Sequence, residues 1–329
     1  MLHRDPPGRW ADDPVLHLQH GWLSRGDSGS PGRPTTRQSR DPGSGTGPVT
    51  IDSTQAVKPS ASVVACCSAV YGSPLAELLV GDSLHPGGLE STRDLLRAAR
   101  LEPGAQLLDV GCGLGASAQI AAAEFGLRVD AVDANGPVLA RARTRAGDLR
   151  VHWTTAALPD LPFDDGSFDA VLAECVLSTV DRGPALAEIA RSLRPGGALL
   201  LSDVEVIGDP LPALGHRIIG AALCVTNAWR PGEIDDRLPE AGFRIIDRWD
   251  RSTSILTLID RIEARLAVAR LAVRDLGLDL RALIGPSATY TDEIPTPELT
   301  RELIESVRAA VRDGTLRYTA VVAVGGDAA

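Results

Sequence analysis

Three alternate glycines form the stretch of the chain whose residue types and spacing best suit chemistry. Gly111, Gly113 and Gly115 follow the run Leu107–Val110 and precede an alanine-rich helical pattern. This order predicts a buried strand, a tight turn and a helix. Glycines in such a turn accept a positive φ and let the backbone approach a ligand closely, and the helix N-terminus offers free N–H groups to a carboxylate or phosphate. We therefore expect a binding loop for a nucleotide-type cofactor.

An acidic residue at the end of the next predicted strand supports a cofactor that contains a ribose. The run 129–133 ends in Asp133, which lies 20 residues after Gly113 (133 − 113). A carboxylate at such a strand end can accept hydrogen bonds from both ribose hydroxyls, although a lone Asp there can also cap the following helix. The glycine spacing also fits a dinucleotide fingerprint, so a dehydrogenase stays the weaker alternative.

Two further motifs narrow the choice of cofactor. The first is Leu-Pro-Phe-Asp-Asp-Gly-Ser-Phe-Asp at 161–169, and the second is Arg-Pro-Gly-Gly followed by an apolar run at 194–203. In this order, and together with the glycine loop, residues 105–250 resemble the class I S-adenosylmethionine-dependent methyltransferases, especially those that act on small molecules. The resemblance implies S-adenosylmethionine as the cofactor and methyl transfer as the reaction. It also implies a Rossmann-like α/β fold, in which a mostly parallel seven-stranded sheet carries helices on both faces.

The resemblance also gives roles to the residues around the loop. The backbone of Gly111, Gly113 and Gly115 would pass under the methionine and adenosine parts of the cofactor. Asp109 would hold the loop or the ammonium group of the cofactor, and Asp133 would accept the ribose diol. These five residues are the core of the expected cofactor site.

One position departs from the family pattern. Many relatives carry an aspartate four residues before the Leu-Pro-Phe motif, where it receives the adenine amino group, but this chain has Ala157. Adenine would then rest on the backbone of Ala157 and Leu158 and on apolar contacts. The same departure favours a non-catalytic cofactor-binding partner subunit, which stays a third hypothesis.

Cysteines supply the first set of candidate groups for the substrate. Cys175 ends a predicted strand, Cys224 lies in a helical stretch, and Cys66 and Cys67 precede the core. This layout resembles the arsenite methyltransferases, in which three thiolates hold trivalent arsenic beside the methyl group of the cofactor. The resemblance implies a metalloid substrate held by Cys175, Cys224 and one of the two N-terminal cysteines. Soft thiolates suit a soft centre, but free cysteines are often only small buried hydrophobes.

Glu174 and His85 are the candidates if the acceptor is instead an oxygen, nitrogen or carbon atom of an organic metabolite. Such an acceptor often needs a general base. Glu174 follows the fourth predicted strand, near the expected place of the methyl group, and His85 precedes two glycines in the predicted cap. We expect no metal ion bound by the protein, and the identity of the acceptor stays open.

The elements that must position these groups follow from the hydrophobic pattern. A tail at 1–58, poor in aliphatic residues, is predicted to be disordered. A helical cap at 59–105 precedes the methyltransferase core at 106–250, where strand and helix patterns alternate. A helical insertion is expected at 251–315, and 316–329 contains the last strand and the C-terminus. In the resembled fold, this strand is antiparallel and lies between the fifth and sixth strands.

The pattern also predicts the individual strands. They are expected at 106–110, 128–133, 150–154, 168–173, 198–202, 243–249 and 316–324. The Pro-Gly-Gly sequence just before the fifth of these is expected to form a turn. A helix is expected from Pro297 to Arg312.

Composition limits the class of protein and of partner. The chain has 329 residues, of which 44% are hydrophobic, so it can bury a sizeable core. The net charge of −10 gives no basic footprint for nucleic acid. No apolar run approaches the roughly 20 residues that a membrane span needs, and the first residues lack the apolar core of a signal peptide. We therefore expect a cytoplasmic enzyme with a small-molecule substrate, in an oligomeric state that the sequence leaves open.

Overall fold

The computed structural model describes residues 77, 80, 81, 83, 85–208, 225–276 and 297–325, and the statements below concern these residues. The predicted tail at 1–58 lies outside them, as does most of the predicted cap before residue 85. Most of the core, the end of the cap and the two long C-terminal helices lie within them, whereas residues 209–224 of the core lie outside.

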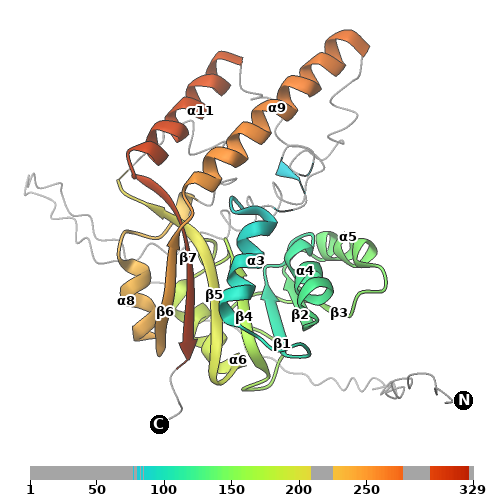
Figure 1. The fold of residues 1–329 in the computed structure, drawn as a ribbon, viewed down its shortest axis with the longest axis vertical. Coiled ribbons are helices and arrows are strands. Elements are labelled where there is room, and N and C mark those ends of the chain that lie inside the picture. The colour runs from blue at the N-terminus through green and yellow to red at the C-terminus, as the bar shows by residue number, and fades with distance from the viewer. Residues whose placement is uncertain are drawn as a thin grey trace, which may run out of the picture. The chain divides into compact units, whose positions relative to one another are not determined.

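Seven strands of the described residues form one sheet in the order β3-β2-β1-β4-β5-β7-β6 (Figure 1). The strands are β1 Gln106–Val110, β2 Arg128–Asp133, β3 Val151–Thr155, β4 Phe168–Glu174, β5 Leu193–Val206, β6 Phe243–Asp250 and β7 Leu316–Gly325. The first five pair in parallel, whereas β7 pairs antiparallel with both β5 and β6. The predicted fold class is confirmed, including the place of the last strand.

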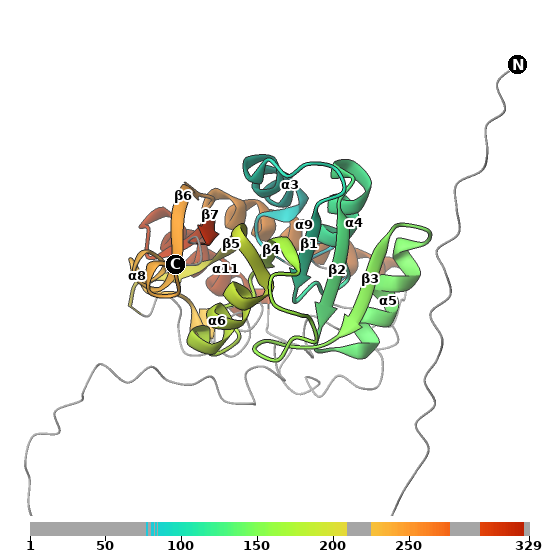
Figure 2. The same cartoon turned by 90° about the horizontal axis from the view of Figure 1, so that it is seen from below.

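Helices cover both faces of this sheet (Figure 2). They are α3 Gly88–Ala99, α4 Ala116–Phe125, α5 Gly136–Ala146, α6 Arg182–Ser192 and α8 Glu233–Glu240. On one face, α3, α4 and α5 bury side chains such as Leu96, Ala118 and Leu139. On the other face, α6 and α8 bury Leu186 and Ile234. The sheet is therefore apolar on both sides, as a parallel sheet of this kind requires.

Two further helices, α9 Thr253–Leu276 and α11 Pro297–Arg312, extend side by side beyond one end of the sheet (Figure 1). Their apolar sides meet β5 and β7 in a buried cluster that includes Ile255, Val307 and Tyr318. Cys175, directly after β4, packs against the same cluster. The two helices therefore lie near the carboxyl ends of β4 and β5, where an open α/β sheet usually binds its ligand.

The fifth strand is longer than predicted. It begins at Leu193, and not at residue 198, because Leu193 already pairs with Phe168 of β4 before a shift in register. The Pro-Gly-Gly sequence that we expected to form a turn therefore lies within β5. Gly197 suits this irregular stretch, since a Cβ there would lie 2.9 Å from the Arg194 carbonyl oxygen. The ends of the other strands agree with the prediction to within one residue.

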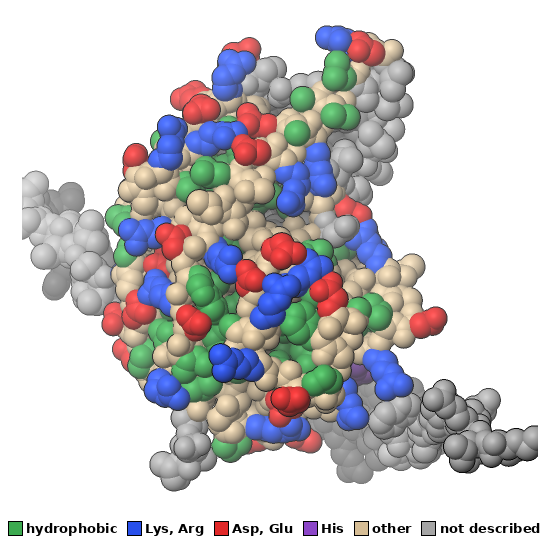
Figure 3. All heavy atoms as spheres, viewed as in Figure 1, with side chains coloured by type: hydrophobic (Ala, Val, Ile, Leu, Met, Phe, Trp, Pro, Cys, Tyr) green, Lys and Arg blue, Asp and Glu red, His purple; other side chains and the backbone are tan. Residues whose placement is uncertain are grey.

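The surface of the described part carries charges of both signs. On the face shown in Figure 3, acidic and basic side chains are interspersed over α3, α9 and α11. Several of them form ion pairs, such as Arg93 with Glu124 and Arg308 with Glu263. Among the described helices, none is long and apolar enough to cross a membrane.

Candidate active site

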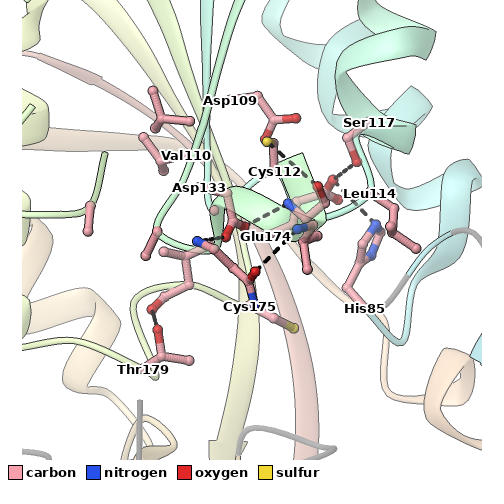
Figure 4. A pocket seen from close by; sticks show the side chains of 18 of the residues that line it. His85, Asp109, Val110, Cys112, Leu114, Ser117, Asp133, Glu174, Cys175 and Thr179 are labelled. Atoms are coloured by element: carbon pink, nitrogen blue, oxygen red, sulfur yellow. Dashed lines mark hydrogen bonds and ion pairs between the residues drawn. The ribbon is translucent and has the colours of Figure 1, made fainter. Parts of the chain in front are cut away.

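A pocket of about 200 Å³ opens at the carboxyl ends of β1, β2 and β4 (Figure 4). The predicted site residues that line it are His85, Asp109, Gly111, Gly113, Asp133, Ala157, Leu158, Glu174 and Cys175. This edge of an open α/β sheet is the usual place for a ligand. The fold therefore brings most of the candidates from the sequence to one cavity.

Positive φ angles explain the three glycines of the loop. The φ angle is 64° at Gly111, 52° at Gly113 and 76° at Gly115, a region that other residues rarely adopt. A Cβ on Gly111 would lie 2.5 Å from Val176 Cγ2, and one on Gly115 would lie 2.3 Å from Trp153 Cη2. Gly111 and Gly113 line the pocket, whereas Gly115 is the N-cap of α4. The tight turn predicted from the sequence is confirmed.

Asp133 ends β2 and fixes this loop. Its Oδ2 accepts a hydrogen bond from Gly113 N at 2.9 Å, and its Oδ1 accepts one from Asn135 N at 2.8 Å. Burial raises the pKa of the carboxyl group. Each carboxylate oxygen can accept more than one hydrogen bond, so these two contacts leave capacity for ribose hydroxyls. The ribose role of Asp133 stays a prediction.

Asp109 offers an oxygen atom without a partner. The side chain is buried, and its Oδ2 has no hydrogen-bond partner among the residues that the structure describes. Burial raises the pKa of Asp109 well above its usual range, and the carboxyl groups of Glu174 and Asp133 raise it further. A buried acceptor without a donor costs free energy, which a ligand can restore by donating to it. The ammonium group of S-adenosylmethionine is such a donor, so the site fits the predicted cofactor.

The pocket is acidic on one wall and apolar on another. Its described lining contains Asp109, Asp133 and Glu174 and neither Lys nor Arg. This charge suits a cofactor that carries a sulfonium and an ammonium group. Ala157 and Leu158 belong to a wall without charged side chains, and the Ala157 carbonyl oxygen accepts a hydrogen bond from the backbone of the same loop. Their contact with adenine stays a prediction.

Glu174 lies beside Ser117 and His85 in the pocket (Figure 4), and two hydroxyl groups donate to one of its oxygens. Glu174 Oε2 accepts hydrogen bonds from Ser117 Oγ at 2.7 Å and from Thr92 Oγ1 at 2.9 Å. His85 Nε2 lies 3.4 Å from the same oxygen, and only 5% of the Glu174 side chain is exposed. Ser202 Oγ makes a long contact of 3.5 Å with Oε1. Oε1 keeps spare capacity to accept.

His85 lies between Glu174 and a tyrosine of the last strand. Its Nδ1 is 3.3 Å from the Tyr318 hydroxyl, and its Nε2 is 3.5 Å from Thr92 Oγ1. The ring is buried against the fold and still lines the pocket. The two residues that the sequence offered as separate candidates for a base, His85 and Glu174, are therefore in contact.

The structure describes two of the cysteines, Cys112 and Cys175, and neither forms a disulfide. Cys112 lies inside the glycine loop, where burial raises the pKa of its thiol well above the usual range. Cys175 lines the pocket, and its φ angle of 56° is left-handed. Cys66, Cys67 and Cys224 lie outside the described residues. A site with three thiolates therefore stays a prediction from the sequence.

Sequence reasoning missed four polar side chains around the His85–Glu174 pair. These are Thr92, Ser117, Ser202 and Tyr318, from α3, α4, β5 and β7. Ser117 offered a signal, because it is the second residue of the helix that follows the glycine loop. The other three lie in elements whose pattern indicates only core packing, so the sequence holds no sign that they meet.

Comparison with known proteins identifies a methyltransferase domain in this chain. Residues 108–201 match a family model described as methyltransferase domain. O-methyltransferase cnsE of Penicillium expansum is 33% identical over 179 residues, which cover 52% of this chain and 61% of that protein. Methyltransferase GfsG of Streptomyces halstedii is 37% identical over 180 residues, which cover 52% of this chain and 64% of that protein. The chain thus matches less than two thirds of the length of either relative.

The fold also has close counterparts among solved structures. Phosphoethanolamine N-methyltransferase 2 of Haemonchus contortus, in complex with phosphomonomethylethanolamine and S-adenosylhomocysteine, gives a TM-score of 0.60 at 20% identity. The match covers 79% of this chain and 58% of that one. At this identity the likeness shows the fold. The family match gives residues 108–201 a methyltransferase domain, and the pocket beside them fits a sulfonium cofactor such as S-adenosylmethionine.

Proposed function

We propose that the protein methylates a small organic molecule at an oxygen, nitrogen or carbon atom. The observation that carries this proposal is the buried contact of 3.4 Å between His85 Nε2 and Glu174 Oε2 in the wall of the pocket. An acceptor that loses a proton as it gains a methyl group benefits from a general base. An imidazole beside a carboxylate suits this role, because the carboxylate stabilises the imidazolium that forms.

The remaining residues of the pocket would bind the cofactor and hold the base in place. S-adenosylmethionine supplies a methyl group on a positively charged sulfur. Asp109 Oδ2 would accept the ammonium group, and Asp133 would accept the ribose hydroxyls. Ser117 and Thr92 fix Glu174 through their hydrogen bonds to Oε2. A fixed Glu174 carboxylate helps to keep the neighbouring His85 ring, the proposed base, aligned when the acceptor binds.

The similar proteins support an organic acceptor without choosing the atom. The name of cnsE describes transfer to oxygen, and the name of the Haemonchus contortus protein describes transfer to nitrogen. Neither name carries over to this chain. An oxygen or nitrogen acceptor that gives up a proton is the chemistry that the His85–Glu174 pair can serve.

A panel of hydroxyl, amine and carbon-acid metabolites with labelled S-adenosylmethionine tests the proposal. We expect methylation of at least one acceptor. With that acceptor, Glu174→Gln and His85→Gln should each lower kcat by about 10²–10⁴-fold and change the dissociation constant of S-adenosylhomocysteine less than about 3-fold. His152→Gln is a matched control, because this exposed histidine pairs with Asp130 away from the pocket.

Full activity of both active-site variants would contradict the proposed base. Cofactor binding without turnover over the whole panel would instead favour the non-catalytic partner subunit. Binding of a nicotinamide cofactor in place of S-adenosylhomocysteine would contradict the methyl-transfer reaction itself.

A soft acceptor such as trivalent arsenic is the second candidate, and Cys175 supports it. A residue other than glycine at φ 56° stores strain of order 1–3 kcal/mol, and such strain is common at functional sites. The strained backbone holds the Cys175 thiol at the pocket wall. Trivalent arsenic carries its own lone pair, so its methylation needs no base. The enzyme would need only to align the acceptor and exclude water.

Arsenite methylation by Cys175→Ser separates the two candidates. If arsenite is the acceptor, the serine variant loses arsenite methylation and keeps S-adenosylhomocysteine binding. Full arsenite methylation by this variant, or none by the unchanged protein, would contradict the second candidate. Neither result affects the test with organic acceptors.

A further inference from the structure

Two residues of the pocket lining each bury a polar side-chain atom that has no hydrogen-bond partner among the described residues. Of the described residues with such an atom, only Ser83 and Asp109 line the pocket. Asp109 Oδ2 can accept a hydrogen bond, whereas the Ser83 hydroxyl has a proton to donate. A buried polar atom without a partner costs free energy until a ligand satisfies it. The pocket thus presents one acceptor and one donor to a ligand.

The proton of Ser83 is the unused one among the hydroxyl groups of the described lining. The other two hydroxyl groups belong to Ser117 and Thr179. Ser117 Oγ donates to Glu174 Oε2 at 2.7 Å, and Thr179 Oγ1 donates to the Val176 carbonyl oxygen at 2.7 Å. The described lining also contains neither Lys nor Arg. An anionic group of a ligand therefore depends on donors such as the Ser83 hydroxyl.

Ser83 and Asp109 belong to the same part of the pocket. Ser83 lies two residues before His85, whose Nε2 is 3.4 Å from Glu174 Oε2. Burial raises the pKa of Asp109, and the charge of Glu174 raises it further, so these two carboxyl groups are close enough to interact. Figure 4 shows His85, Glu174 and Asp109 around the glycine loop. The unused donor and the unused acceptor can therefore meet the same end of one ligand.

Contacts on both sides hold the segment that carries Ser83. Before it, Glu77 forms ion pairs with two arginines of α5, Arg141 and Arg145. After it, His85 Nδ1 lies 3.3 Å from the tyrosine hydroxyl of β7. The segment is thus tied to elements on either side of Ser83. A hydroxyl on a backbone that is held in this way loses little freedom when it binds a ligand.

An unused acceptor beside an unused donor complements the amino acid end of a ligand. An ammonium group only donates hydrogen bonds and a carboxylate only accepts them, and in an α-amino acid both groups are attached to the same carbon atom. S-adenosylmethionine ends in such a pair. With its ammonium group at Asp109 Oδ2, the carboxylate needs a donor nearby.

We propose that Ser83 is a cofactor-binding residue, whose hydroxyl donates a hydrogen bond to the carboxylate of the methionine part of S-adenosylmethionine. The inference depends on the cofactor and not on the identity of the methyl acceptor, so it goes beyond the proposed function. It gives the segment before α3 a direct part in cofactor binding.

Titration calorimetry of Ser83→Ala with two ligands tests the inference. The ligands are S-adenosylhomocysteine and decarboxylated S-adenosylhomocysteine, which keeps the amine and lacks the carboxylate. We expect the dissociation constant of S-adenosylhomocysteine to rise about 10-fold, since a hydrogen bond to a charged group is lost. The dissociation constant of the decarboxylated ligand should stay within about 2-fold of its value for the unchanged protein.

Ser91→Ala is the matched control. Ser91 Oγ is also buried without a hydrogen-bond partner among the described residues, but Ser91 does not line the pocket. This variant should keep both dissociation constants within about 2-fold. Because neither serine hydroxyl has a partner to lose, both variants should unfold without ligand at or above the temperature of the unchanged protein. With S-adenosylhomocysteine present, Ser83→Ala should gain less thermal stability than the other two proteins.

Two results would overturn the inference. One is an unchanged affinity of Ser83→Ala for S-adenosylhomocysteine, and the other is an equal loss of affinity for both ligands. Neither turnover nor an acceptor enters these measurements. Failure of the proposed function is therefore seen separately, as missing methylation of the acceptor panel by a protein that binds S-adenosylhomocysteine.

Discussion

The two ends of the pocket are built in different ways. At the proposed cofactor end, the groups come from the loop at 109–115 and from Asp133, and glycine conformations shape the backbone between them. At the proposed acceptor end, side chains from α3, α4, β4, β5 and β7 bond to one another around Glu174 and His85. A short stretch of sequence therefore encodes the first end, and the packing of distant elements forms the second. We expect changes at the first end to weaken cofactor binding and changes at the second to slow turnover.

The largest expected effect comes from a side chain in the glycine loop. A methyl group in Gly111→Ala would start 2.5 Å from Val176 Cγ2, at a backbone φ of 64°. We expect cofactor affinity to fall by about 100-fold or more, since the loop must shift to remove the clash. Titration calorimetry with S-adenosylhomocysteine measures the loss.

Gly104→Ala is the matched control for this variant. Gly104 also has a positive φ, of 92°, but a Cβ there would meet no atom within 4 Å. Gly104→Ala should lose about 1 kcal/mol of stability from backbone strain. Gly111→Ala should lose more because of its clash, and it alone should lose cofactor affinity. Equal affinities in the two variants would refute the proposed close approach of the loop to the cofactor.

An intermediate effect is expected from proton linkage at Asp109. Because its pKa is raised in the free protein, the carboxyl group keeps its proton to a higher pH than in the unfolded chain. Stability should therefore fall as pH rises from the unfolded-state pKa towards the folded-state pKa. The cofactor ammonium favours the ionised carboxylate, so binding should release a proton and affinity should rise with pH over the same window.

Calorimetry in two buffers of different ionisation enthalpy measures this release. Asp109→Asn should reduce it and weaken cofactor binding by about 10-fold, the equivalent of one pKa unit. A smaller release should remain, because burial also raises the pKa of Asp133. Unchanged proton release in Asp109→Asn would show that the ammonium group binds elsewhere.

The same difference between the two ends explains what the sequence could predict. The glycine turn and the strands around it follow from local patterns, and the structure confirms both. The predicted start of β5 was wrong, because pairing with β4 overrides the turn preference of the Pro-Gly-Gly sequence. His85 and Glu174 were identified one by one from residue type and place. Their contact, and that of His85 with Tyr318 at a separation of 233 residues, depends on tertiary packing that no local pattern encodes.

The smallest expected effect comes from one of the donors on Glu174. Thr92→Val removes the hydrogen bond of 2.9 Å to Oε2 and leaves that of Ser117. A single hydrogen bond is worth about 1 kcal/mol, so kcat should fall about 3–10-fold while cofactor affinity stays unchanged. Thr144→Val, on the exposed side of α5, removes only a bond to the Ala140 carbonyl and should have no effect on turnover. A loss of cofactor affinity in Thr92→Val would show that the two ends of the pocket are not independent.

A crystal structure of the protein with S-adenosylhomocysteine tests the central claim most directly. We expect the ribose hydroxyls at Asp133, the adenine over Ala157 and Leu158, and the ammonium group at Asp109 Oδ2. The sulfur atom should then face the contact between His85 and Glu174. An ammonium group bound by Glu174, or a sulfur atom turned away from this pair, would contradict the assignment of Glu174 and His85 to the acceptor.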